Sequence, residues 1–434
     1  MSSNLATVVE EGNSAANKSR VGVVPPRQIV VATFIMMLYQ GYMTAINGIA
    51  SPWIAAGFGL GESEIARLYA WISLSAIGAL VISRYADRVG RRRVLLLCMT
   101  ATPLLALAAA LSTNLPVFTI FDIGVYACST ATISSSVVLI AEGLPIEMRA
   151  KGQSWGGMAL GLGGGVCVVL VPILSAQGQS WRWLLFFGAT GILLVPYMRR
   201  VIPESERWKL AATTGATSGR RFYDVFEPAY RARTIPVLLC SLLSMSAVTA
   251  VTSWGYFHAV SVNNLSPSSA SLMTIIGGGL SFAGLAGGAW GAERFGRVPT
   301  VAAAGLLLAS GGMFFYWGPP RGFSAPAVWL GGGFGWFMIA VNAWMVAGNS
   351  IATELFPTAL RSTMLGWLAL VQAVASVTCQ AIIAVAAAAA GGLSIVVGYV
   401  GLLAVPSAII FALTIEETRG LSLEAAAREE GFGV

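Results

Sequence analysis

Long apolar segments alternate with short polar ones along almost the whole chain. Runs of about 20 apolar residues have the length that a helix needs to cross the hydrocarbon core of a bilayer. Such runs recur at about residues 28–50, 65–85, 93–112, 116–140, 153–176, 182–202, 234–260, 269–291, 298–317, 325–352, 363–388 and 392–414. This pattern predicts an all-α integral membrane protein with twelve transmembrane helices, whose ends are placed only to within a few residues.

The composition agrees with a chain that lies mostly in lipid. Of its 434 residues, 56% are hydrophobic and 10% are charged, whereas soluble domains carry about 25% charged residues. The five cysteines fall inside apolar runs without paired spacing. We interpret them as small core residues, and with a single histidine in the chain we expect no metal site.

The positive charges indicate an orientation. All but three of the 26 Lys and Arg residues fall in the termini or in alternate loops, and the exceptions are Arg67, Arg182 and Arg321. Loops rich in Lys and Arg remain in the cytoplasm. We therefore predict a multi-pass protein of the cytoplasmic (inner) membrane with both termini in the cytoplasm and no removable signal peptide. The net charge of +7 then reflects topology and not a nucleic-acid partner.

Two polar patterns occur once in each half of the chain. Residues 142–149 and 354–361 both read E-x-x-P-x-x-x-R, 212 residues apart. Upstream of them, Asp87–Arg91 (DRVGR) and Glu293–Arg297 (ERFGR) are 206 residues apart. Such a repeat indicates duplication of a multi-helix unit, which in membranes builds carriers with a site between the two halves.

The repeat predicts two pseudo-symmetric six-helix bundles. The expected divisions are a cytoplasmic tail at 1–27, a first bundle at 28–202, a cytoplasmic central loop at 203–233, a second bundle at 234–414 and a cytoplasmic tail at 415–434. Small residues at every fourth position let helices approach closely. We therefore expect a seam between the halves where two sets of glycines meet, namely Gly157, Gly161 and Gly165 against Gly284, Gly288 and Gly291.

Three further motifs support a family resemblance. Ser83–Arg92 (SRYADRVGRR), Pro203–Trp208 (PESERW) and Glu416–Glu424 (EETRGLSLE) resemble the G-x-L-A-D-R-x-G-R-R, P-E-S-P-R-W and P-E-T-K-G-L-S-L-E patterns of the major facilitator superfamily, in its sugar-porter and organic-ion (metabolite:proton symporter) branches. The resemblance covers about residues 28–425 and implies the major facilitator fold, with transport by alternating access.

The chain also departs from that family at positions used for coupling. Proton-coupled relatives often carry D-G-F-D in the first helix, where this chain reads Gln40-Gly41-Tyr42-Met43. They often carry an arginine early in the fourth helix, where Ile120 stands here. The antiporter Gly-Pro signature is absent after Gly161, which makes a drug exporter less expected. The coupling residues therefore have to be found in this chain itself.

Charged residues cluster at the predicted cytoplasmic helix ends of both halves. We expect them to form ion-pair clusters that act as a cytoplasmic gate, closed in the outward-open state and broken when the inner face parts. The alternative is that they only set topology and anchor helix ends. The candidates are Asp87, Arg88, Arg91, Glu142, Arg149 and Glu204 in the first half, and Glu293, Arg297, Glu354, Arg361 and Glu417 in the second.

Two ionisable residues lie inside apolar runs and are candidates for proton coupling. Asp122 is the only acidic residue at membrane depth, where a charge costs about 2.5–3.5 kcal/mol. We expect it to carry a proton or contact a cation, or else to be hydrated and structural near the outer surface. His258 is the only histidine. It would titrate or donate to an anionic substrate, or else be an interface residue among aromatics.

Neutral amides and aromatic rings share the helices expected to face the central site. The substrate-binding candidates are Gln40, Tyr42, Asn47, Trp254, Tyr256, Trp336, Asn342 and Trp344. Such groups suit a small solute with a ring and a few hydrogen-bonding groups. No Lys or Arg lies in the middle of a membrane run, where it could clamp a carboxylate.

Together these features predict a secondary active transporter of a small organic solute. We expect proton-coupled uptake of an aromatic or ring-bearing metabolite, a weak organic acid or a sugar-like compound. A facilitative uniporter and a drug or metabolite efflux carrier remain alternatives. The chain lacks the nucleophile–base and metal-ligand sets of an enzyme. We expect no cofactor, and a monomer whose partners are the solute, protons and membrane lipid.

Overall fold

The structure is a computed structural model that describes residues 25–202, 223–318 and 326–419. Within these ranges twelve helical spans are long and apolar enough to cross a membrane. The spans agree with the predicted runs to within a few residues at most ends, which confirms the all-α membrane fold. The largest shift is at the end of the first helix, which continues to Phe58 and does not stop near residue 50. The first helix of the second half begins at Pro228, ahead of the predicted residue 234. Its first turns carry Arg231 and Arg233 and so extend beyond the apolar run that marks the span in the sequence.

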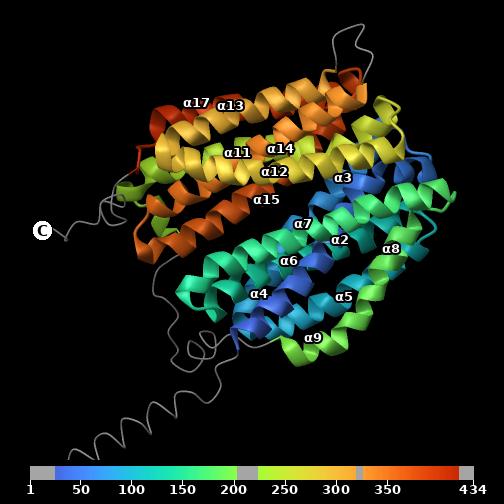
Figure 1. Ribbon diagram of the computed structural model, residues 1–434, viewed down its shortest axis with the longest axis horizontal. Coiled ribbons are helices and arrows are strands. Elements are labelled where there is room, and N and C mark those ends of the chain that lie inside the picture. Colours follow the sequence, from blue (N-terminus) through green and yellow to red (C-terminus); the bar gives the residue numbers. More distant parts are fainter. Residues whose placement is uncertain (1–24, 203–222, 319–325, 420–434) are drawn as a thin grey trace, which may run out of the picture.

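The chain forms two bundles that lie side by side (Figure 1). The first half comprises α2 (Pro26–Phe58), α3 (Glu62–Ser73), α4 (Ser75–Val89), α5 (Arg91–Leu111), α6 (Leu115–Gly143), α7 (Ile146–Ala176), α8 (Arg182–Ala189), η1 (Thr190–Leu194) and α9 (Val195–Val201). The second half comprises η2 (Asp224–Phe226), α11 (Pro228–Phe257), η3 (His258–Val262), α12 (Pro267–Arg294), α13 (Arg297–Tyr316), α14 (Pro326–Glu354), α15 (Thr358–Ala389), α16 (Leu393–Gly401) and α17 (Ala404–Thr414).

Local sequence signals set several helix ends. Asn114 caps α6 by accepting a 3.0 Å hydrogen bond from the amide of Val117, and Ser266 caps α12 by accepting from Ser269 at 3.2 Å. Both helices also have a proline in their first two positions, where the missing amide hydrogen costs nothing. Gly59 ends α2 with a φ of +66°, a left-handed conformation that favours glycine.

The two helices expected to meet across the halves, α7 and α12, do meet, but the glycines named for the seam do not form the contact. A Cβ at Gly161 or Gly165 would meet nothing within 4 Å. The close approach on α7 uses Gly163 instead, where a Cβ would lie 1.9 Å from the carbonyl oxygen of Leu38 on α2. On the second half, a Cβ at Gly284 would lie 2.2 Å from the carbonyl oxygen of Ile339 on α14. Small residues thus pack helices within each half, because four-residue spacing marks a close-packing face without naming the neighbour.

The two ends of the molecule differ in charge. The end that carries Arg91, Glu142, Arg297 and Glu354 is called the charged end here, and the opposite end, which carries Glu62, is called the distal end. Because each half contains six spans, both halves begin and finish at the charged end.

The halves are joined at the distal end by contacts that cross between them. The Glu62 carboxylate, at the start of α3, accepts a 2.8 Å hydrogen bond from the backbone amide of Leu393, at the start of α16. Ser271 of α12 donates to the carbonyl of Val168 of α7 at 3.0 Å. The helices that meet most extensively across the boundary are α3 with α15, α2 with α11 and α7 with α12, and α4 also meets α15 and α3 meets α16.

Candidate functional site

A cavity of about 590 Å³ lies between the two halves. Its walls come from α2, α3, α4 and α6 of the first half and from α11, α12, α14 and α15 of the second. It extends from Tyr69 and Tyr256, near the distal end, to Ser83 and Ser134, toward the charged end. This position between duplicated halves is the one that the internal repeat predicts for a carrier site.

The cavity is closed at its distal side by aromatic rings from both halves. The ring of Tyr69 lies 4.7 Å from that of Trp254, centroid to centroid. The ring of Trp53 lies 6.0 Å from that of Tyr256. Together with the hydrogen bonds of Glu62 and Ser271, these contacts seal the distal end. Any solute in the cavity therefore exchanges by way of the charged end in this conformation.

The described cavity wall combines apolar residues with polar side chains that carry no charge. Its polar side chains are hydroxyls and amides from both halves, and no Lys, Arg, Asp, Glu or His is among the described residues that line it: Thr44, Asn47, Tyr69, Ser73, Ser75, Ser83, Tyr126, Thr130, Ser134, Thr249, Thr252, Ser253, Tyr256, Thr274, Gln372, Ser376 and Gln380. Helical spacing accounts for the wall of α15, where Gln372, Ser376 and Gln380 follow at four-residue intervals on one face. The wall can hydrogen-bond a solute without supplying a net charge.

Asp122 lies one side chain behind this wall. It is 1% exposed, and its Oδ2 accepts a hydrogen bond from Nδ2 of Asn47, which does line the cavity. The hydroxyl of Tyr69 donates to the carbonyl oxygen of Asn47. The hydroxyl of Tyr126 donates to the carbonyl oxygen of Thr44 at 2.6 Å. The predicted proton-coupling acid is therefore buried and linked to the cavity through Asn47, and it is not a hydrated group near the surface.

His258 lies inside the second half and is not a cavity residue. It is 3% exposed and packs against the rings of Phe315 and Tyr316. Its Nε2 pairs with the amide Nδ2 of Asn263 at 2.9 Å, and its Nδ1 pairs with the hydroxyl of Ser394 at 2.7 Å. An amide nitrogen can only donate, so Nε2 accepts and the proton resides on Nδ1. Both ring nitrogens are occupied, which matches the alternative of an interface residue among aromatics.

Two of the eight predicted substrate-binding residues line the cavity. These are Asn47, described above, and Tyr256, whose hydroxyl donates to the carbonyl of Pro267 at 3.1 Å and lies 3.0 Å from that of Ser271. Both come from helices whose sequence combines polar and aromatic residues, which is the signal that identified them.

Three other candidates are buried away from the cavity. Gln40 packs inside the first half with its Nε2 at 3.4 Å from the sulfur of Met99. The hydroxyl of Tyr42 donates to the carbonyl of Leu184 at 2.7 Å and so ties α2 to α8. Trp254 is fully buried, and its Nε1 donates to Oε1 of Gln380 at 3.0 Å. A polar residue in an apolar run can therefore form a hydrogen bond inside the bundle as readily as it can line a binding site.

The remaining three candidates lie on α14, which contributes only Phe334 to the described cavity wall. Trp336 is half exposed on the outside of the bundle and donates to the carbonyl of Leu307 at 3.1 Å. Asn342 donates to the carbonyl of Met338 in its own helix at 3.0 Å. Trp344 packs within the second half beside Cys240.

Sequence reasoning missed most of the wall. The prediction placed the site on too few helices, because α3, α4, α12 and α15 also face the cavity. Tyr69, Tyr126, Gln372 and Gln380 are the clearest omissions. The four-residue spacing of Gln372, Ser376 and Gln380 in an apolar run would have identified the wall of α15.

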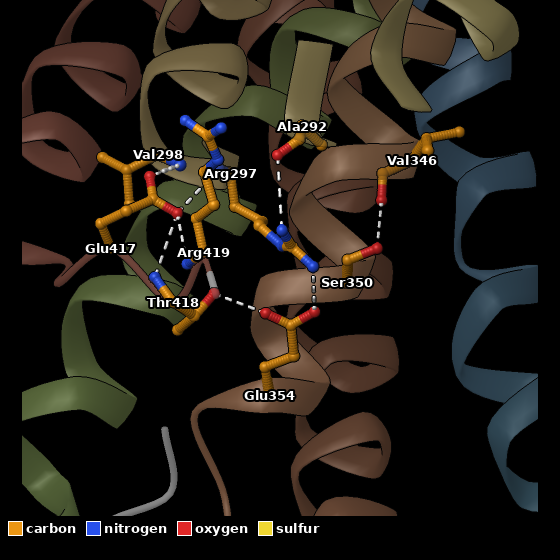
Figure 2. Close-up of polar contacts among 9 residues, drawn as sticks. All are labelled: Ala292, Arg297, Val298, Val346, Ser350, Glu354, Glu417, Thr418 and Arg419. Carbon is orange, nitrogen blue, oxygen red and sulfur yellow. Dashed lines mark hydrogen bonds and ion pairs between the residues drawn. The ribbon is translucent and has the colours of Figure 1, made fainter. Parts of the chain in front are cut away.

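At the charged end, each half has an ion pair between two of the predicted gate residues. Arg91 at the start of α5 pairs with Glu142 at the end of α6. In the second half Arg297, at the start of α13, pairs with Glu354, at the end of α14, at 3.2 Å (Figure 2). The hydroxyl of Thr418 also donates to Glu354. The repeat of the sequence is thus a repeat of ion pairs.

We expected these ion pairs to break when the cytoplasmic face opens, and this arrangement does not fit that expectation. Each pair joins neighbouring helices of one half, and both pairs are present although the cavity is sealed at the distal end. Their geometry matches the alternative, in which they anchor helix ends. Contacts that break on opening have to cross between the halves, and sequence spacing within one half cannot identify such partners.

Glu417 has a different role from the ion pair expected for it. Its carboxylate accepts hydrogen bonds from the backbone amides of Arg297 at 2.9 Å and Val298 at 3.0 Å, the first residues of α13 (Figure 2). Free amides at a helix N-terminus favour a negative charge. Gly296 precedes them with a φ of +113°, and a Cβ there would lie 2.4 Å from the Glu417 carboxylate.

The other gate candidates make no such contacts or lie outside the description. Arg88 and Glu293 are exposed. The side chains of Asp87, Arg149 and Arg361, and the whole of Glu204, lie outside the described residues. Within the described part of the chain, no three His, Cys, Asp or Glu residues are grouped to hold a metal ion.

Comparison with known proteins identifies the family. The sequence pattern of the Major Facilitator Superfamily matches residues 32–378, which is most of the chain. The chain belongs to this superfamily of transporters, as the motifs at the helix ends indicated. It is a multi-pass membrane protein with the major facilitator fold.

Among characterised relatives, a gallate transporter of Pseudomonas putida is 29% identical over 198 residues, which are 44% of this chain and 42% of that protein. The 4-hydroxybenzoate transporter PcaK of Pseudomonas aeruginosa is 23% identical over 387 residues, 79% of this chain and 82% of that protein. The match to the gallate transporter thus spans less than half of that protein's length.

Among solved structures, the xylose transporter XylE from E. coli in an inward open conformation has the same fold. The TM-score is 0.72 over 93% of this chain and 99% of that one, at 19% sequence identity.

Proposed function

We propose that this protein imports a small aromatic acid across the cytoplasmic membrane by alternating access. The observation that carries the proposal is the uncharged cavity between the halves, with tyrosines, hydroxyls and amides in its wall. Aromatic faces bind a ring, and hydroxyls and amides bind its polar substituents. The relatives named for gallate and 4-hydroxybenzoate are transporters of such compounds.

Proton symport is the proposed energy source, with Asp122 as the proton carrier. A buried carboxylate without a cationic partner is costly, so proton uptake relieves the cost of burying the charge. Asn47 connects Asp122 to the cavity wall, and Tyr69 connects Asn47 to the closure at the distal end. Uptake and release of a proton at Asp122 would thereby affect both the binding of the solute and the closure at the distal end.

The test is uptake of labelled 4-hydroxybenzoate and gallate into proteoliposomes with an imposed pH gradient. Wild type is expected to accumulate one of these acids when the outside is acidic. Asp122→Asn is expected to abolish accumulation while exchange of external for internal solute without a gradient continues. Accumulation that survives Asp122→Asn would refute the assignment of the proton site.

A facilitative uniporter is the second candidate, favoured by the fact that Asp122 does not itself line the cavity. A uniporter would let the solute equilibrate across the membrane without accumulating, in wild type and in Asp122→Asn alike. Gradient-driven movement out of cells that express the protein would instead identify an efflux carrier.

We infer that the charged end faces the cytoplasm, because the Lys and Arg residues gather there. The conformation described here is then inward-open. A fluorescent protein that folds only in the cytoplasm, fused after residue 434, should fluoresce, and a fusion in the 177–181 loop should not. We further propose that the transporter works as a monomer in lipid, which the mass of the detergent-solubilised protein would test.

A further inference from the structure

Gln380 of α15 is a buried amide in the cavity wall. Only 2% of its surface is exposed, and it lies toward the sealed distal side of the cavity. Its Oε1 accepts a 3.0 Å hydrogen bond from Nε1 of Trp254 on α11. Trp254 is fully buried, so this bond is shielded from water.

The bond to Trp254 determines which end of the amide is available. An indole Nε1–H only donates, so the atom of Gln380 that meets it is the oxygen. The Nε2 group, which carries two donors, therefore points away from Trp254. None of the described residues accepts its hydrogen bonds, and it is not among the enclosed unpaired atoms, so it opens onto the cavity.

The tyrosines of the same wall have no free donor. A phenol has one O–H hydrogen. Tyr69 donates to the carbonyl of Asn47, Tyr126 to that of Thr44 and Tyr256 to that of Pro267. These hydroxyls can accept from a solute but have no hydrogen left to donate to one.

We propose that the N–H groups of Gln380 bind the carboxylate of the substrate and that Trp254 positions them. The proposal rests on the proposed function and adds the orientation of the acid in the site. The carboxylate lies at the sealed distal side, and the ring lies among Tyr69, Tyr256 and Phe334. Hydrogen bonds to a charged group are stronger than those to a neutral one, which favours an acid over its alcohol without any cation in the wall.

Trp254 acts through Gln380, and it also contacts the other half. Its ring lies 4.7 Å from that of Tyr69 on α3. The carboxylate site is therefore complete only while α11 and α15 hold this arrangement beside α3. A bound acid would stabilise the sealed distal side through the Gln380–Trp254 pair.

The test is calorimetric binding to the full-length protein in lipid nanodiscs. The ligands are 4-hydroxybenzoate or gallate, whichever wild type binds better, and the benzyl alcohol with the same ring hydroxyls. The proteins are wild type, Gln380→Met, Trp254→Phe and the double variant. Gln380→Ser replaces Gln380→Met if the latter does not fold.

Loss of a hydrogen bond to a charged group weakens binding about tenfold or more. Gln380→Met should therefore weaken the acid at least about tenfold and the alcohol by less than about threefold. Trp254→Phe keeps a ring beside Tyr69 but frees the amide to turn, so it should weaken the acid by an intermediate factor. The double variant should match Gln380→Met alone, because Trp254 acts only through Gln380.

Three results would overturn the proposal. Gln380→Met could bind the acid within threefold of wild type, the acid and the alcohol could lose affinity equally, or wild type could bind the alcohol as tightly as the acid. Additive effects in the double variant would remove the positioning role of Trp254. If wild type bound none of the aromatic acids, the proposed function itself would fail, and this inference with it.

Discussion

Asp122 and Glu354 show how differently two acidic side chains are stabilised in one membrane protein. Asp122 has an amide donor, Asn47, and is almost fully buried. Glu354 sits at a helix end, where it pairs with Arg297 and accepts from Thr418. We propose the first as the proton carrier, whereas the second pairs with a cation and anchors the helix ends.

Glu354→Ala should destabilise the second half. The Arg297 and Glu354 side chains are only 23% and 17% exposed, so removing one leaves a partly buried cation without its partner. Breaking a buried pair costs about 3–5 kcal/mol, and partial exposure reduces this to about 1–3 kcal/mol. Thermal unfolding of the detergent-solubilised protein should show a lower midpoint for Glu354→Ala.

Glu293→Ala is the matched control, since Glu293 belongs to the same charged end but is exposed and has no ion pair with a described residue. Its unfolding midpoint should stay close to that of wild type. Equal midpoints for the two variants would show that the Arg297–Glu354 pair adds no stability.

At the scale of elements, the packing of α2 on α7 depends on glycines at the contact. Gly41 and Gly163 face the backbone of the partner helix, where added Cβ atoms would lie 2.0 Å from the Leu160 oxygen and 1.9 Å from the Leu38 oxygen. Backbone atoms cannot rotate away as a side chain can. The two helices would have to separate to admit a methyl group.

Gly163→Ala should therefore lower stability, and Gly161→Ala should not. Overpacking a tight contact costs about 1–3 kcal/mol. A Cβ at Gly161 meets nothing within 4 Å, and alanine favours a helix by up to about 1 kcal/mol over glycine. Unfolding midpoints of the two variants, measured in the same detergent, should fall on opposite sides of the wild-type value or at least differ by several degrees.

At the scale of the whole molecule, the balance between conformations depends on contacts that cross the two halves. The hydrogen bond from the Leu393 amide to Glu62 joins the two halves across the closed distal end. Loss of this hydrogen bond would destabilise the conformation with a sealed distal end relative to the conformation in which the distal end is open.

Glu62→Ala should thus shift the protein toward distal opening. A hydrogen bond to a charged group at an exposed site contributes about 1 kcal/mol, which corresponds to roughly a fivefold change in the ratio of states. The five native cysteines are buried, so a Ser253→Cys probe in the cavity can be labelled with little background. Its labelling by an impermeant thiol reagent added on the distal side should rise.

Glu64→Ala serves as the control for this experiment. Glu64 lies on the same helix, but its carboxylate contacts the Gly61 amide at 3.0 Å and Arg67 at 3.8 Å, both within the first half. Equal labelling of the Glu62 and Glu64 variants would remove the role assigned to Glu62.

The sequence predicts the fold well and the site only in part, for a reason visible in α15. The length and hydropathy of residues 363–388 suffice to place a transmembrane helix there. The helical face that carries Gln372, Ser376 and Gln380 is also periodic in the sequence. That this face meets the cavity, while Asn342 of α14 bonds its own helix, depends on how each helix is rotated within the bundle.

The sequence alone determined the twelve spans, the duplication and the clustering of charge at one end. Each of these follows from local quantities, namely the apolar length that crosses a bilayer, a repeated motif and the cost of placing charge in lipid. Only the tertiary structure decided which polar residues line the cavity, that Asp122 meets Asn47, and that the ion pairs stay within one half. Those are contacts between segments far apart in the chain, and local sequence does not specify the rotation and partner of each helix.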